Sequence, residues 1–224
     1  MAYDIRDSAS LEFLREYVQG CAAGLEAYDE LAALAAPWLT FFARLTTARD
    51  ERDSARFQRV RTIRRYKVLK AKLLAELTAL SGNVYLLSGK DAAKPPYATI
   101  FKGRKVEDLK HLGFNNLKDQ GNALFAAADS ANVAVLGPAL SDLRQSFDRV
   151  VAAGEAKKAA RLALITHETA RAGLVVACEE LGESAEAAIL AALPGRNDLV
   201  RLTLSPSLES SPADKKENEE PVPQ

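Results

Sequence analysis

The chain has 224 residues, of which 48% are hydrophobic and 27% are charged, and its 30 Lys and Arg residues balance its 30 Asp and Glu residues. This hydrophobic content is enough for a packed core and excludes a chain that is disordered throughout. The longest uncharged apolar stretch, residues 31–43, contains Pro37 and is shorter than the roughly 20 residues that span a bilayer. The polar N-terminus lacks the apolar segment of a secretory signal. We therefore expect a cytoplasmic protein without a transmembrane segment.

Two apolar stripes near the N-terminus predict amphipathic helices. The first steps by three and four residues, as a heptad seam does, and consists of Leu11, Leu14, Val18, Cys21, Leu25 and Tyr28. The second follows after an extra step of three and consists of Leu31, Leu34, Trp38, Phe41 and Leu45. The pattern leaves open whether residues 9–47 form one bent helix or two. Because Trp38 is in register with leucines, we expect it in a core or an oligomer seam rather than at a membrane surface.

The next helix is predicted over residues 46–80. Its apolar stripe consists of Tyr66, Leu69, Leu73, Leu77 and Leu80. Ser81, Gly82 and Asn83 tolerate left-handed backbone, so we expect the helix to end there. Residues 82–105 then form an irregular loop, in which residues 97–101 (YATIF) are expected to be a short strand or extended segment.

Helix returns in the second half of the chain. Its periodicity is weak over residues 106–128 and strong from Gly137, where the seam consists of Leu140, Leu143, Phe147 and Val150. We expect Gly154 to end this helix and an alanine-rich buried helix to follow over residues 157–193. The sequence thus predicts an all-α fold. In detail we expect an antiparallel four- or five-helix bundle with long coiled-coil-like helices over residues 1–204, and a disordered, acidic, proline-rich tail over residues 205–224.

The most distinctive feature of the sequence is a concentration of positive charge in residues 49–72, which contain three acids and ten basic residues. The basic residues are Arg49, Arg52, Arg56, Arg59, Arg61, Arg64, Arg65, Lys67, Lys70 and Lys72. When they are projected on a helix they fall on two separate faces. Because the rest of the chain must carry a net charge of about −7, the cations either bind an anionic partner or pair with acids of the fold or of a second subunit.

Tests for catalytic motifs fail. The segment from Gly82 to Lys90 resembles a phosphate-binding loop, but six residues separate its glycines and Asp91 stands where Ser or Thr is required. His167 begins an HExxH pattern whose second histidine is replaced by Arg171. We therefore expect no metal and no cofactor. One enzymatic alternative remains, in which polar residues of the 82–121 region converge, namely Tyr97, Lys102, Asp108, His111 and Asn115.

Cys21 and Cys178 lie far apart in the sequence and form no CxxC pair. We expect both to pack in the core, although the spacing leaves a disulfide between them open.

The function expected from these observations is that of a non-enzymatic helical interaction or assembly module, which binds a protein partner or associates with itself as a homo-oligomer. The alternative is binding of nucleic acid or another polyanion through residues 49–72, assisted by the loop at residues 90–105. That loop adds the basic residues Lys90, Lys94, Lys102, Arg104 and Lys105.

Overall fold

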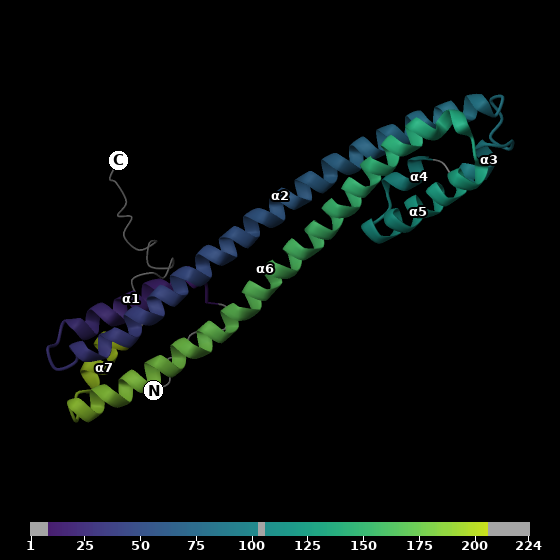
Figure 1. Cartoon of the computed structure of the whole chain (residues 1–224). Coiled ribbons are helices and arrows are strands. Elements are labelled where there is room, and N and C mark those ends of the chain that lie inside the picture. Colours follow the sequence, from purple (N-terminus) through teal and green to yellow (C-terminus); the bar gives the residue numbers. More distant parts are fainter. Residues whose placement is uncertain (1–8, 103–105, 206–224) are drawn as a thin grey trace, which may run out of the picture. The chain divides into compact units, whose positions relative to one another are not determined.

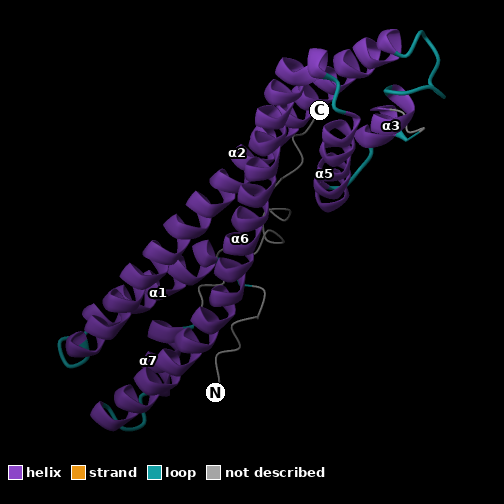
Figure 2. Cartoon of the chain, turned by 45° about the vertical axis from the view of Figure 1, so that its right-hand side comes forward, coloured by secondary structure: helices purple, strands orange, loops and turns teal. Residues whose placement is uncertain are grey.

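A computed structural model describes residues 9–102 and 106–205 (Figure 1). Every regular element in these residues is helical and is drawn in purple in Figure 2, and the predicted all-α class is confirmed. The α-helices are α1 (Leu11–Glu26), α2 (Ala35–Leu87), α3 (Tyr97–Phe101), α4 (Val106–Lys110), α5 (Phe114–Ala131), α6 (Gly137–Ala192) and α7 (Asn197–Leu204). Two short 3₁₀ helices, η1 (Ala32–Leu34) and η2 (Ala134–Leu136), precede α2 and α6. Apart from Ser205, the predicted tail lies outside the described residues.

The chain divides into two compact units. Unit 1 consists of Met1–Ser54 and Ile165–Gln224, and unit 2 consists of Ala55–Leu164. The long helices α2 and α6 each have residues in both units.

Unit 1 is built around the two N-terminal apolar stripes. All residues of these stripes are buried except Tyr28 and Leu34, which are partly buried against the same core. The first stripe lies in α1 as far as Leu25, whereas the second begins at η1 and continues in α2. The side chain of Ser10 caps α1 by accepting a hydrogen bond from the Phe13 N–H. Trp38 is fully buried, as predicted. Helix α7, which the sequence did not indicate, lies against α1 and adds Leu199, Val200 and Leu204 to the core (Figure 1).

Unit 2 has its own core. The stripe from Tyr66 to Leu80 and the seam from Leu140 to Val150 are buried in it, with Leu69 partly buried. Helices α3 and α5 complete this core with residues such as Ile100, Phe101, Leu117 and Phe125. These stripes therefore predicted the buried faces of the long helices correctly.

Two predictions for residues 81–101 were wrong. Helix α2 does not end at residues 81–83 but continues to Leu87, because Val84 is fully buried in the core of unit 2 while Gly82 and Asn83 face solvent. Residues 97–101 form helix α3 rather than a strand. The helical turn brings the rings of Tyr97 and Phe101 to a centroid distance of 4.8 Å and places Ile100 and Phe101 in the core.

The predicted end of a helix at Gly154 was also wrong, since α6 runs unbroken from Gly137 to Ala192. Gly154 is buried, and a Cβ atom at this position would overlap the ring of Phe114 at the start of α5. Gly121 of α5 has the same relationship to the ring of Phe147 of α6. Both glycines are therefore needed for close packing of a phenylalanine against a neighbouring helix rather than for termination.

Candidate anion-binding site

The ten basic residues of the 49–72 segment have three different environments. Arg49 and Arg52 belong to unit 1 and are paired with acids. The Arg49 guanidinium lies 2.7 Å from Asp50, and that of Arg52 lies 2.9 Å from Glu12 and 3.0 Å from Asp53. A hydrogen bond from its own backbone N–H lowers the pKa of Glu12, and the Arg52 guanidinium lowers it further. Arg52 therefore links α1 to α2.

At the other end of the segment, Lys70 and Lys72 are also engaged. The amino group of Lys70 donates hydrogen bonds to the backbone carbonyls of Lys110 (2.9 Å), the last residue of α4, and of Leu112 (2.8 Å), two residues later. Burial lowers the pKa of Lys70, and the nearby charge of Lys157 lowers it further. Lys72 lies 3.7 Å from Glu76, one turn along the same helix.

The six residues between them are exposed, and their charged groups form no ion pair or hydrogen bond with any residue that the structure describes. They are Arg56, Arg59, Arg61, Arg64, Arg65 and Lys67. Among them, Phe57, Val60 and Val68 expose 65%, 46% and 69% of their surfaces. This part of α2 thus presents unpaired cations and apolar side chains together.

The two units have opposite net charges. Unit 2 contains 20 Lys and Arg and nine Asp and Glu, a net charge of +11, and unit 1 contains ten Lys and Arg and 21 Asp and Glu, a net charge of −11. The charge asymmetry that the sequence showed in one segment is therefore a property of whole units.

A cleft of about 520 Å³ opens within unit 2. Its lining residues come from three helices and the residue before α5, and they are Arg59, Ile63, Gly113, Phe114, Asn115, Asn116, Gly154, Lys157, Lys158 and Arg161. Four of these are cations and none is an acid. The charged group of Lys158 lies 2.8 Å from the Asn115 Oδ1 atom, 3.7 Å from Glu155 and 4.6 Å from the centre of the Phe114 ring.

Local structure explains why these groups converge. Arg59 and Ile63 are one turn apart on α2, on the face that continues to the buried Tyr66. Lys157, Lys158 and Arg161 lie within one turn of α6, and the ammonium of Lys157 stands 4.9 Å from the centre of the Tyr66 ring. The first turn of α5 begins after Gly113, which has no side chain to cap it. Sequence analysis missed the three α6 cations, although their i, i+1, i+4 spacing was a signal for a basic helical turn.

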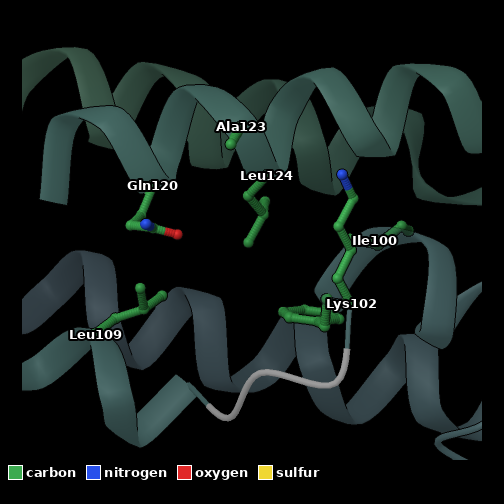
Figure 3. Close-up of a pocket in the computed structure, with 7 residues that line it drawn as sticks. Ile100, Lys102, Leu109, Gln120, Ala123 and Leu124 are labelled. Atoms are coloured by element: carbon green, nitrogen blue, oxygen red, sulfur yellow. The ribbon is translucent and has the colours of Figure 1, made fainter. Parts of the chain in front are cut away.

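Another cavity of unit 2 is smaller, about 80 Å³, and mainly apolar (Figure 3). It is lined by Ile100, Phe101, Lys102, Leu109, Gln120, Ala123 and Leu124. Figure 3 shows the side-chain oxygen of Gln120 turned toward the space between the labelled residues, and this buried oxygen accepts no hydrogen bond from a described residue.

The five polar residues of the enzymatic alternative do not line a common cavity among the two described above. Lys102 lines the smaller cavity and Asn115 lines the basic cleft, while Tyr97, Asp108 and His111 line neither. Of the loop cations, Lys94 lies 3.5 Å from Asp91, whereas Arg104 and Lys105 are outside the described residues.

The two cysteines and His167 are the other chemically active side chains considered from the sequence. Cys21 and Cys178 are free thiols in the core of unit 1, and burial raises the pKa of both to about 12. The Nδ1 atom of His167 lies 4.0 Å from Glu51. Within residues 9–102 and 106–205 no three His, Cys, Asp or Glu side chains are grouped as metal ligands would be. In the same ranges, none of the helices is apolar over a length that would cross a bilayer.

Comparisons with protein-family models, with curated proteins and with solved structures found no match for this chain.

Proposed function

We propose that the chain is a non-enzymatic interaction module that associates with further copies of itself, the acidic unit of one molecule binding the basic unit of the next. The observation that carries this proposal is the division of a neutral chain into units of net charge −11 and +11. Opposite potentials of this size attract the two units and disfavour contacts between like units. Because the two contacting surfaces differ, such an association is head-to-tail and yields rings or open chains.

Matched surfaces on the two units support the proposal. On α2, Phe57, Val60, Arg61 and Arg64 follow the i, i+3, i+4, i+7 spacing of one helical face, here called the basic face, and all are exposed. On α6, Val176, Glu180 and Glu183 follow the i, i+4, i+7 spacing and are likewise exposed; they are called the acidic face.

Each face combines apolar and charged side chains, which is the composition expected of a protein interface with a desolvated centre. The acids of the acidic face have no ion pair with described residues, so they are available to a second molecule.

The proposal includes the coiled-coil-like packing, the antiparallel helices and the cytoplasmic location that we expected from the sequence. The buried heptad-spaced seams of α1 and α6 support coiled-coil-like packing within each unit. The short connection between α1 and α2 supports an antiparallel arrangement of these two helices. The free thiols of Cys21 and Cys178 are consistent with a reducing compartment and support a cytoplasmic location.

Charge reversal tests the proposal. One double variant carries Arg61→Glu and Arg64→Glu, and the other carries Glu180→Lys and Glu183→Lys. We expect each to abolish association, because each places like charges opposite one another. Mixing the two variants should restore it, since each then retains one native face that the other can bind. The measurement is light scattering and sedimentation over concentration at low and high salt. The double substitution Arg149→Glu and Lys90→Glu, at exposed sites of unit 2, is the control for the Arg61 and Arg64 variant and makes the same change in net charge.

Self-association that survives both charge reversals, or a wild-type chain that stays monomeric at low salt and high concentration, would refute the proposal. Restoration by mixing is the sharper criterion, because a merely misfolded variant cannot produce it.

A second candidate function is binding of nucleic acid or another polyanion, which the six exposed and unpaired cations of residues 56–67 favour. Arg56 and Leu87, where the loop begins, lie about 46 Å apart along α2, so a ligand that contacts both of these positions is an extended polymer.

The test of this candidate is fluorescence anisotropy with labelled single- and double-stranded oligonucleotides across a salt series. Binding should weaken steeply with salt because bound counterions are released. Replacing Arg56, Arg59, Arg64 and Arg65 by Gln should reduce both the affinity and the salt slope. No binding at low salt would exclude polyanion binding, and affinity that is unchanged in this variant would exclude binding through residues 56–67.

A further inference from the structure

We propose that the basic cleft of unit 2 binds the phosphate group of a small phosphorylated organic ligand. This site is distinct from the basic face proposed for self-association: Arg59 and Ile63 line the cleft, whereas Phe57, Val60, Arg61 and Arg64 make up the basic face. The inference therefore does not depend on the proposed function.

The charge of the cleft is the first argument. Arg59 of α2 and Lys157, Lys158 and Arg161 of α6 line it, and no acid is among the lining residues. The guanidinium groups of Arg59 and Arg161 have no ion pair or hydrogen bond with a described residue. Like charges gathered in this way repel one another. A bound anion would relieve this repulsion.

The geometry of the donors is the second argument. Guanidinium groups match the oxygens of a phosphate with paired, charge-assisted hydrogen bonds. Here two arginines from different helices border the same cleft as two lysines and the side chains of Asn115 and Asn116. The first turn of the 18-residue helix α5 adds backbone N–H groups that lack a side-chain cap. The donors thus come from three helices of one unit.

The size of the cleft decides the class of ligand. Its volume of about 520 Å³ falls in the range of about 300–1,000 Å³ that holds drug-sized ligands and cofactors, and it is larger than a bare phosphate requires. Ile63 and the ring of Phe114 provide apolar surface beside the cations. A ligand that joins a phosphate to an apolar or aromatic group, as a nucleoside diphosphate does, satisfies both parts of the lining.

The experiment is calorimetric titration of the full chain with inorganic pyrophosphate and with ADP at low salt. The cleft variant carries both Lys157→Gln and Arg161→Gln. The matched control carries both Arg65→Gln and Lys67→Gln, which removes two exposed cations of unit 2 outside the cleft. Because the cleft variant loses charge-assisted hydrogen bonds to the phosphate oxygens, it should lose about tenfold or more in affinity and the control less than about twofold. Arg161→Gln alone, which alters an exposed side chain, should show a smaller loss with an unchanged melting temperature.

The outcomes distinguish a small phosphorylated organic ligand from free pyrophosphate and from a nucleic-acid backbone. Tighter binding of ADP than of pyrophosphate, lost selectively in the cleft variant, supports the proposal. Absence of binding, equal losses in both variants, or ADP binding no tighter than pyrophosphate would overturn it. A titration with a single-stranded oligonucleotide adds one more arm. If the oligonucleotide binds in the cleft while ADP does not, the phosphate belongs to a nucleic-acid backbone and the small-ligand proposal fails.

Discussion

The hydroxyl group of Tyr17 in α1 donates a buried hydrogen bond of 2.8 Å to the backbone carbonyl of Leu204, the last residue of α7 and 187 positions later in the chain. The ring of Tyr17 also packs edge-on against Trp38, at a centroid distance of 6.0 Å. One side chain therefore joins α1, α2 and α7. The last carbonyl groups of a helix accept no hydrogen bond from within that helix. The Tyr17 hydroxyl therefore provides a donor to the Leu204 carbonyl, which would otherwise be buried without one.

Replacing Tyr17 by Phe keeps the ring and removes this donor. We expect the free energy of unfolding to fall by about 1–3 kcal/mol, because the carbonyl of Leu204 is left buried and unpaired. Chemical unfolding followed by circular dichroism measures the change. Tyr28→Phe is the control in the same unit, since the Tyr28 hydroxyl has no hydrogen bond with a described residue. Equal effects of the two substitutions would show that the Tyr17 bond is not a stabilising one.

Gly154→Ala tests the packing of Phe114 against α6. The new Cβ atom would overlap the Phe114 ring, so we expect a loss of about 1–3 kcal/mol from overpacking. Gly82→Ala, at an exposed position of α2 where a Cβ meets no atom within 4 Å, should instead stabilise unit 2 by about 0.5–1 kcal/mol. Thermal unfolding of both variants gives the sign of each effect. A stabilising Gly154→Ala would contradict the close contact.

Lys70→Met tests whether this lysine has a structural role. The substitution keeps an unbranched side chain but removes the donor that serves the carbonyls of Lys110 and Leu112. We expect a loss of about 1–3 kcal/mol. Lys72→Met, which removes only an exposed pair with Glu76, should change stability by less than about 0.5 kcal/mol. If the two variants unfold at the same denaturant concentration, the carbonyl contacts contribute nothing to stability.

The buried thiols predict an alkaline dependence of stability. Burial raises the pKa of Cys21 and Cys178 from 9.0 to about 12. Between these values the unfolded chain releases thiol protons and the folded chain keeps them, so stability falls as pH rises. The stability contributed by the protonated thiols is fully present below pH 9. Above pH 9 each thiol steepens the fall of the free energy of unfolding by up to about 1.4 kcal/mol per pH unit.

The test is to measure unfolding in urea at a series of pH values for the wild type and for the double variant Cys21→Ala and Cys178→Ala. The variant should differ by a constant amount between pH 7 and 8 and then decline less steeply above pH 9. Parallel curves across the whole range would show that neither thiol is protected from ionisation.

Local patterns in the sequence predicted the helical class and most of the buried faces. Leu11, Val18 and Leu25 recur at heptad spacing, and such spacing places side chains on one face of a helix whatever lies opposite. Local signals failed at helix ends. Gly82 and Gly154 both resemble terminators, but burial of Val84 and packing of Phe114 on α6 outweigh the cost of a glycine in a helix, which is about 1 kcal/mol.

The candidate site was found only in part. The sequence indicated Arg59 as one of ten basic residues, but nothing in its neighbourhood relates it to Lys157 or Arg161, about a hundred positions later. Helical periodicity carries information over a few turns, whereas the cleft depends on contacts between remote segments.

The sequence by itself determined that the chain is helical, which faces of its helices are apolar, and that its positive charge is concentrated in one segment. These properties follow from residue type and spacing within single helices. Only the tertiary structure decided which cations are paired. Arg52 meets Glu12 and Lys70 meets two carbonyls, while Arg59 and Arg161 border an open cleft. The reason is physical: an ion pair depends on the distance between charged groups, and the folding of remote segments sets that distance.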